Sequence, residues 1–373
     1  MISCSEFVDH LNALGIDTAV GVPDSTFKGL ISCFESTEKI NHITACNECE
    51  AVAVSAGYYL ATNRPALTYM QNSGFGKTIN PCTSLYSREI YSIPGLFLVG
   101  WRGKPDEKDE PQHKTMGRIM LNLFNTLEIP CTVLNESEWK KQVSETYRVS
   151  RANEIPSVLV VPKGLFDSFP PSGRQEDSAL LLREQMLELV IEHLAADTFF
   201  VSTTGKTSRE LFEIRERNNQ GHAGDFLTVG SMGCASAIAF GIALNKPEKR
   251  ICIIDGDGAA LMQLGSMATI GHYQLKNLMH IIIDNNAHES TGGQPTVSDS
   301  VDFGAIGKAC GYPYIYYAQN EKDVCDSVKA VQAADALSLL IIKCRKGSRK
   351  DLGRPTTTPE ENKIAFMKKL GSV

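Results

Sequence analysis

The chain has 373 residues, which at roughly 150 residues per domain predicts two or three domains, each able to bury its own core. Lysine and arginine total 37, aspartate and glutamate total 43, the net charge is −6 and 42% of residues are hydrophobic. These values exclude a disordered or fibrous chain and argue against a nucleic-acid binder. The apolar runs are shorter than the ~20 residues that span a bilayer. We therefore expect a cytoplasmic protein that binds no membrane, and its eleven scattered cysteines favour reduced thiols over disulfides.

Apolar runs typical of buried strands alternate with helical patterns along most of the chain. Strands are predicted over residues 43–46, 66–70, 96–99, 158–161, 199–202, 251–254, 279–283 and 339–343. Helices are predicted over residues 51–60, 180–196 and 259–271. This alternation is typical of parallel sheets covered by helices, so the predicted fold class is α/β.

One segment, residues 166–177, interrupts the alternation. It gathers two prolines, a serine, a glycine and several charges within a few residues, the composition of an exposed linker. We expect the domain boundary there. The predicted domains are residues 1–168 and 178–373, with no middle domain between them.

Gly256-Asp257-Gly258 follows a predicted strand and opens a predicted helix. It begins like a dinucleotide fingerprint, but Leu261 stands where a third glycine is needed, and the Asp257 carboxylate would repel a pyrophosphate. Magnesium removes this conflict, because it binds carboxylate, amide and carbonyl oxygens together with phosphate. The next strand ends in Asp284-Asn285-Asn286, so carboxylate and amide oxygens are expected at one edge of the sheet.

Asp257, followed 28 residues later by Asn285, resembles the two-part signature of the thiamine-diphosphate enzymes. This resemblance implies two thiamine-diphosphate-binding domains, the first for the pyrimidine ring and the second for the diphosphate and Mg²⁺. The implied metal ligands are the side chains of Asp257 and Asn285 and the carbonyl of Ala287. Asn286 is the alternative ligand if the register shifts by one residue.

The same resemblance implies further cofactor contacts. Glu48 is similar to the family's glutamate that protonates the aminopyrimidine ring, although a solvated carboxylate at a helix start is the alternative. Met232 is similar to the apolar residue that bends the cofactor, although most methionines fill cores. The implied contacts of the diphosphate are Thr203, Thr204, Gly205, Gly256, Gly258 and Ala259.

Longer motifs resemble the phosphonopyruvate and sulfopyruvate decarboxylases within this family. They cover residues 21–25, 71–76, 109–113, 284–296 and 347–355. The resemblance implies decarboxylation of 3-phosphonopyruvate to phosphonoacetaldehyde and carbon dioxide, in phosphonate biosynthesis, with sulfopyruvate as the alternative substrate. It also implies a homodimer or higher homo-oligomer with sites between subunits.

An anionic keto acid requires cationic or N–H donors and a source of protons. The predicted substrate-binding residues are Asp24, Ser25, Asn72, His113, Arg349 and Arg354. Lys77, Arg88 and Arg102 compete for the anion, and the basic segment 345–354 is equally consistent with a solvated surface.

Two of these residues also have predicted catalytic roles. His113, expected in a polar loop, is the predicted proton donor, and Ser25 is expected to orient the substrate carboxylate or relay a proton. His288 and Glu289 are alternatives to His113 as the proton donor.

Overall fold

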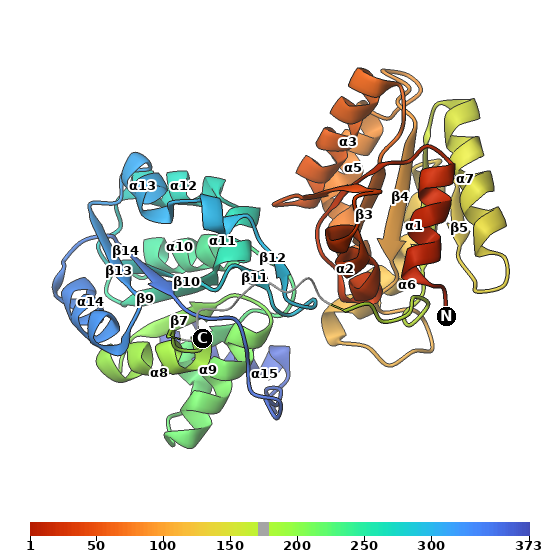
Figure 1. Cartoon of the computed structure of the whole chain (residues 1–373). Coiled ribbons are helices and arrows are strands. Elements are labelled where there is room, and N and C mark those ends of the chain that lie inside the picture. Colours follow the sequence, from red (N-terminus) through yellow and green to blue (C-terminus); the bar gives the residue numbers. More distant parts are fainter. Residues whose placement is uncertain (171–178) are drawn as a thin grey trace. The chain divides into compact units, whose positions relative to one another are not determined.

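The computed structural model describes residues 1–170 and 179–373. The chain divides into two compact units, Met1–Arg174 and Gln175–Val373. Each unit contains one six-stranded sheet in which all neighbouring strands run parallel (Figure 1), which confirms the α/β prediction. Most of the predicted linker, from residue 171 onward, lies outside the described residues, as does the predicted start of the second domain at residue 178.

The first sheet has the strand order β2-β1-β3-β4-β6-β5. Its strands are β1 Thr18–Gly21, β2 Asn41–Thr44, β3 Leu67–Gln71, β4 Gly95–Gly100, β5 Cys131–Val133 and β6 Pro156–Val161. Its α-helices are α1 Cys4–Ala13, α2 Lys28–Ser36, α3 Glu48–Thr62, α4 Asn72–Phe75, α5 Ile79–Ser84, α6 Pro111–Thr126 and α7 Trp139–Asn153. Both faces are buried: along β4, Leu96 packs into the cluster that includes α1, while Phe97 packs into the cluster that includes α3.

The second sheet has the strand order β13-β14-β10-β9-β7-β8. Its strands are β7 Phe199–Ser202, β8 Asp225–Leu227, β9 Ile251–Gly256, β10 Leu278–Asp284, β13 Tyr314–Ala318 and β14 Ser338–Lys343, and β11 Ala287–His288 pairs with β12 Gln294–Pro295 in a separate antiparallel ladder. Its α-helices are α8 Arg183–His193, α9 Lys206–Arg217, α10 Ala235–Asn245, α11 Asp257–Met262, α12 Gly265–Tyr273, α13 Phe303–Ala309, α14 Glu321–Ala333 and α15 Pro359–Leu370.

In both sheets the chain adds its second strand on one side of the first strand and its third strand on the other side. In the first, β2 lies on one side of β1 and β3 on the other. In the second, β8 and β9 flank β7 in the same way. Loops that leave adjacent strands in opposite directions open a crevice at the carboxyl edge, where α/β folds bind ligands. The ends of β1 and β3, and those of β7 and β9, are therefore the places to search for a site.

The single helix predicted over residues 259–271 is wrong. α11 ends at Met262 and α12 begins at Gly265, because Gln263 has φ −131° and ψ 44°, outside the helical region. A Cβ on Gly233 would come within 2.7 Å of the Gln263 Cγ atom. Gln263 thus leaves the helix where it packs against the loop that carries Met232.

The sequence contains eleven cysteines. All eleven lie in the described residues and are free, and five of them are buried. Within residues 1–170 and 179–373, no helix has the length and apolar character needed to cross a membrane.

Candidate active site

The loop after β7 is shaped for close approach of another group. Thr203, Thr204 and Gly205 follow this strand, and Gly205 precedes the first residue of α9. Gly205 has φ +101°, and a Cβ there would come within 2.5 Å of the Ser290 Oγ atom, so the position requires glycine. The Gly230 N–H donates to Thr204 Oγ1 over 3.0 Å, which ties this loop to the one that carries Met232. The N–H groups that open α9 lack intrahelical partners and suit phosphate oxygens.

Asp257 is a buried carboxylate that lies close to the carboxylate of Asp284. Its Oδ2 atom accepts hydrogen bonds from the hydroxyls of Thr296 and Ser298. The same Ser298 hydroxyl lies 2.9 Å from Asp284 Oδ1, although one hydroxyl has a single proton to donate. Burial, with a further contribution from Asp284, raises the pKa of Asp257 to about 6. Lys343 pairs with Asp284, so the site favours an added cation near Asp257.

The turn after β10 follows the strand that pairs with β9, and its Asn286 Oδ1 atom lies 2.6 Å from the Ser298 hydroxyl that also contacts Asp257. The Asn285 Nδ2 group donates to Glu289 over 2.9 Å, and Asn285 Oδ1 accepts from the Ala287 N–H over 3.2 Å. Asn286 has φ +54°, a left-handed conformation that glycine and asparagine tolerate best. Within the described ranges, no group of three or more His, Cys, Asp or Glu side chains is placed to hold a metal ion. The predicted set needs only one such side chain, together with amide and carbonyl oxygens.

The side chains of Met232 and His288 both lie close to Gly258, at the start of α11. A Cβ on Gly258 would lie 2.9 Å from the His288 Cε1 atom and 3.3 Å from the Met232 Cε atom. Burial lowers the pKa of His288 to about 4, so its ring is neutral at pH 7. Met232 is half-buried rather than enclosed in the core. This placement is consistent with an apolar contact to a bound molecule.

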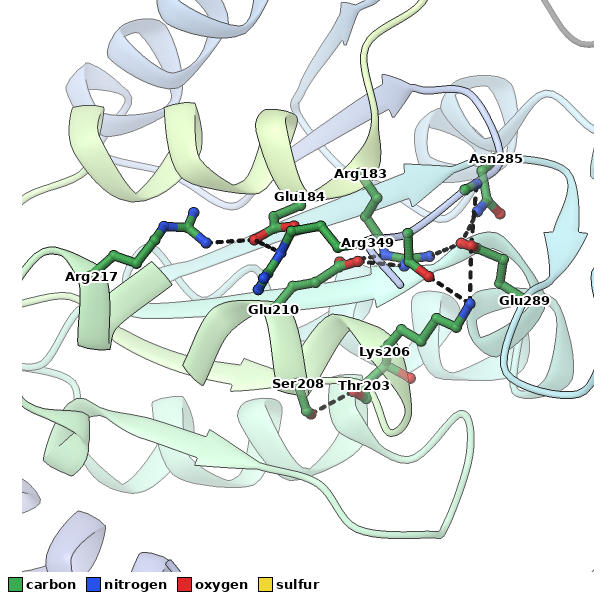
Figure 2. Close-up of polar contacts among 12 residues, drawn as sticks. Arg183, Glu184, Thr203, Lys206, Ser208, Glu210, Arg217, Asn285, Glu289 and Arg349 are labelled. Carbon is green, nitrogen blue, oxygen red and sulfur yellow. Dashed lines mark hydrogen bonds and ion pairs between the residues drawn. The ribbon is translucent and has the colours of Figure 1, made fainter. Parts of the chain in front are cut away.

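A chain of ion pairs connects the turn after β10 to α8 and α9 (Figure 2). Arg183 is 5% exposed, and its guanidinium donates to both carboxylate oxygens of Glu210, over 2.6 and 2.7 Å, and also to Glu289. Lys206 Nζ lies 3.3 Å from Glu289 and donates to Ser348 Oγ over 2.7 Å. Burial alone would raise the pKa of Glu289, but Arg183 and Lys206 outweigh it and hold that pKa below its usual range.

Arg349 lies in a second set of ion pairs. Its guanidinium contacts Glu184, Glu213 and Asp351, while Arg217 approaches Glu184 from α9. Arg354 is exposed. The segment 345–354 is thus anchored to α8 and α9, and both arginines remain predictions as substrate-binding residues.

In the first unit, Glu48 opens α3 and is 6% exposed. Its carboxylate lies against α4, because a Cβ on Gly74 would come within 2.2 Å of Glu48 Oε1. Lys77 Nζ lies 3.4 Å from Oε2, but this atom has no hydrogen-bond partner. Glu48 is therefore a buried carboxylate with an unused acceptor, unlike a solvated helix-start residue.

A polar cluster lies at the ends of β1, β3 and β4. Arg102 donates to both oxygens of Asp109, over 2.8 and 2.5 Å, and its remaining Nη1 group donates to Ser25 Oγ over 2.9 Å. The Asn72 side chain donates to the Arg102 carbonyl over 2.8 Å. Asp24 is fully buried, burial raises its pKa, and its Oδ2 atom lacks a hydrogen-bond partner. The first-unit substrate candidates Asp24, Ser25 and Asn72 thus converge around Arg102.

His113 does not lie in the polar loop that was expected from the sequence. It occupies the first turn of α6, because Pro111 begins this helix with a residue that needs no N–H partner. Burial, with a further contribution from Arg102, lowers the pKa of His113, and its Nδ1 atom has no hydrogen-bond partner. A Cβ on Gly103 would come within 2.1 Å of the His113 carbonyl, so α6 lies directly on the loop that carries Arg102.

Three residues of the ion-pair chain, Arg183, Lys206 and Glu210, were missed by sequence reasoning. One signal was available for Arg183, because it shares a helical face with Met186, Leu187 and Val190, all buried. A charged residue on an apolar face predicts a buried partner. The identity of that partner was not available, since Glu210 and Glu289 lie 27 and 106 residues away.

Replacing Arg183 by Met should lower the free energy of unfolding by about 3–5 kcal/mol, because Glu210 and Glu289 then stay buried without their cation. The matched control is Arg217→Met, which removes the guanidinium of a 42% exposed side chain from Glu184 and Glu188 and should change stability by less than about 1 kcal/mol. Urea unfolding followed by circular dichroism measures both. Equal effects of the two substitutions would contradict the structural role of Arg183.

Comparison with known proteins agrees with this geometry. Residues 5–122 match the N-terminal TPP binding domain of the thiamine pyrophosphate (thiamine diphosphate) enzymes, and residues 203–342 match their C-terminal TPP binding domain. The chain is 35% identical to a phosphonopyruvate decarboxylase of Streptomyces viridochromogenes, over 97% of this chain and 93% of that protein.

Two further relatives carry a different substrate in their names. The chain is 25% identical to a sulfopyruvate decarboxylase of Methanosarcina acetivorans, over 97% of this chain and 96% of that protein. It is 36% identical to a sulfopyruvate decarboxylase subunit beta of Methanococcus maripaludis, over 50% of this chain and 96% of that subunit. The matched domains and the full-length similarity show that the chain belongs to the thiamine-pyrophosphate-dependent decarboxylases.

Proposed function

We propose that the chain is a magnesium-dependent decarboxylase of 3-phosphonopyruvate that acts in phosphonate biosynthesis. The choice of 3-phosphonopyruvate as the substrate rests on the similarity to a phosphonopyruvate decarboxylase over 97% of the chain. The bond between the carboxylate carbon and the carbonyl carbon breaks, carbon dioxide leaves, and a proton takes its place to give phosphonoacetaldehyde.

The second unit fits the metal and the diphosphate. Asp257, Asn285 and the Ala287 carbonyl would hold Mg²⁺, and the raised pKa of Asp257 supports this role because a buried carboxylate gains most from a cation. Asn286 remains the alternative ligand, because its Oδ1 atom approaches the Ser298 hydroxyl that also contacts Asp257. When bound, thiamine diphosphate supplies a nucleophilic carbon and an electron sink.

Backbone groups at the ends of β7 and β9 would bind the diphosphate. These groups belong to Thr203, Thr204, Gly205, Gly256, Gly258 and Ala259. Glycine at positions 205 and 258 supports this assignment, because a Cβ there would clash with Ser290 or His288, and glycine leaves the backbone N–H groups at the helix starts uncovered. Met232 would support the cofactor from the adjacent loop.

In the first unit, Glu48 would face the aminopyrimidine ring. The unpartnered Oε2 atom supports this role, since a buried acceptor without a hydrogen bond is unfavourable until a donor arrives. Lys77 lies near the same oxygen and would keep the carboxylate oriented.

Arg102 is the cation best placed for an anionic keto acid in this unit. Asp109 fixes its orientation through two hydrogen bonds, and its Nη1 group points to Ser25, whose own hydroxyl proton is available to the substrate. Asn72 and Asp24 would shape the same pocket. Arg349 and Arg354 are the alternative anion-binding residues, although Arg349 already has carboxylate partners.

His113 would supply the proton that replaces carbon dioxide. A bound anion raises the pKa of a neighbouring imidazole, which offsets the lowering by burial. The alternative donors are less suitable: His288 is buried with a pKa of about 4, and Glu289 is held ionised by Arg183 and Lys206.

The assembly that we propose is a homodimer or higher homo-oligomer with sites shared between subunits. Relatives named as alpha and beta subunits of sulfopyruvate decarboxylase support oligomerisation. We also propose that the protein works in the cytoplasm, a reducing compartment that suits eleven free cysteines.

Sulfopyruvate decarboxylation is the second candidate function. The 25% identity to a sulfopyruvate decarboxylase over 97% of the chain favours it specifically. Both substrates carry a tetrahedral anionic group, so the same cations would serve either, but a phosphonate can bear one more negative charge than a sulfonate.

The test is a decarboxylation assay in which an alcohol dehydrogenase reduces the aldehyde product. With thiamine diphosphate and Mg²⁺ present, we expect kcat/KM to fall in the order phosphonopyruvate, sulfopyruvate, pyruvate. The kcat/KM for pyruvate should be more than roughly tenfold below that for phosphonopyruvate, because the cation that pairs with the phosphonate then loses a charge-assisted contact. A higher kcat/KM for sulfopyruvate would establish the second candidate, and turnover of none of the three would overturn both.

Replacing Arg102 by Ala should raise KM for phosphonopyruvate by roughly tenfold or more, because the charge-assisted contact is lost, with a much smaller effect on pyruvate. The matched comparison is Arg349→Ala, assayed with the same two substrates. If only Arg349→Ala shows the selective effect, the anion binds at segment 345–354 and the role proposed for Arg102 is wrong.

A further inference from the structure

Glu289 is the common acceptor of four groups in the second unit. Its Oε1 atom lies 3.2 Å from the Gly347 N–H and 3.3 Å from Lys206 Nζ. Its Oε2 atom accepts from the Arg183 guanidinium and, over 2.9 Å, from the Asn285 Nδ2 group (Figure 2). Both oxygens are therefore saturated, and Glu289 joins α8, α9 and segment 345–354 to the turn that carries Asn285.

The contact with Asn285 has a chemical consequence. A side-chain amide has a donor end and an acceptor end, whereas an ionised carboxylate only accepts. Because the Glu289 oxygens accept from the Asn285 Nδ2 group as well as from Arg183, Lys206 and the Gly347 N–H, the Oδ1 end of Asn285 points the other way. Mg²⁺ binds oxygen and not an amide NH₂ group. The orientation of this amide thus decides whether Asn285 is a competent ligand.

We propose that Glu289 is a positioning residue that holds the Asn285 amide with its oxygen toward the cation. The proposal rests on the function proposed above, in which Asn285 binds Mg²⁺. Arg183, itself held by Glu210, keeps the Glu289 carboxylate in place. Glu289 therefore acts through Asn285 and does not touch the metal.

A double-mutant cycle tests this role through Mg²⁺ affinity, measured by calorimetry with thiamine diphosphate at saturation. Asn285→Asp keeps an oxygen ligand but sets two carboxylates against each other, so affinity should fall on the order of tenfold. Glu289→Gln weakens the acceptor that fixes the Nδ2 end, so that the Ala287 N–H is the main remaining contact that orients the Asn285 amide, and it should also weaken binding. In the double variant, the amide introduced at position 289 donates to the carboxylate introduced at position 285, so affinity should recover to within about threefold of the wild type.

The matched control is Glu213→Gln, the same change in a carboxylate that contacts segment 345–354 through Arg349 and Gly353. Combined with Asn285→Asp, it should give additive effects, because it has no contact with Asn285. Additive effects in the Glu289 cycle as well would overturn the positioning role while leaving the metal role of Asn285 intact. An unchanged affinity in Asn285→Leu, which removes the oxygen ligand, would instead overturn that metal role, and with it the proposal.

A second variant covers the case in which Glu289→Gln does not fold. Glu289→Asp keeps the negative charge beside Arg183 and Lys206 but is one methylene too short for the contact with Asn285. Its thermal unfolding temperature should stay near that of the wild type, while Mg²⁺ affinity falls by several-fold. Wild-type Mg²⁺ affinity in this variant would contradict the proposal.

Discussion

The second unit depends on how its buried negative charge is balanced. Asp257 and Asp284 lie close enough to share the Ser298 hydroxyl, and both are at most 2% exposed. Lys343 compensates Asp284. An uncompensated buried carboxylate is unfavourable by several kcal/mol, which the raised pKa of Asp257 expresses. A divalent cation at Asp257 resolves this conflict and at the same time provides a place for a diphosphate.

Next to the turn after β10, an arginine of the protein itself balances two further carboxylates. The side chains of Glu210 and Glu289 are 0% and 7% exposed, and the Arg183 guanidinium pairs with both of them. This arrangement fixes Glu289, which in turn contacts Asn285. The proposed metal site is therefore supported by a set of ion pairs that comes from α8, α9 and the segment after β14. In the first unit, Asp109 orients Arg102 by the same kind of pairing.

The sequence predicted the parts of the fold that form long apolar runs. All eight predicted strands are present within a few residues of their expected bounds, including β9 and β10, which place Asp257 and Asn285 at one sheet edge. β5 and β8 have only three residues each, and the edge strand β13 is largely solvent-facing, so none of them leaves a clear apolar pattern. β1 is buried but only four residues long.

The candidate site could be predicted where its residues belong to a short sequence motif. It could not be predicted where charged residues far apart in the sequence pair in the folded chain. Asp257, Asn285 and Glu48 follow from local sequence, as do the turn residues around them. The pairing of Arg183 with Glu210 and Glu289 depends on tertiary packing, as does the orientation of Arg102. Segment 345–354 is ambiguous in sequence, since its charges suit either a ligand or a surface. Its anchoring through Arg349 to Glu184 appears only in the folded chain.

The central claim is that a cation at Asp257 makes diphosphate binding possible. The most direct measurement is calorimetric titration of thiamine diphosphate into the wild type and into Asp257→Asn, each with Mg²⁺ and with a chelator. We expect binding to the wild type that weakens by at least roughly tenfold in chelator, and weak, Mg²⁺-independent binding to Asp257→Asn. Equally tight binding to the wild type with and without Mg²⁺ would contradict it.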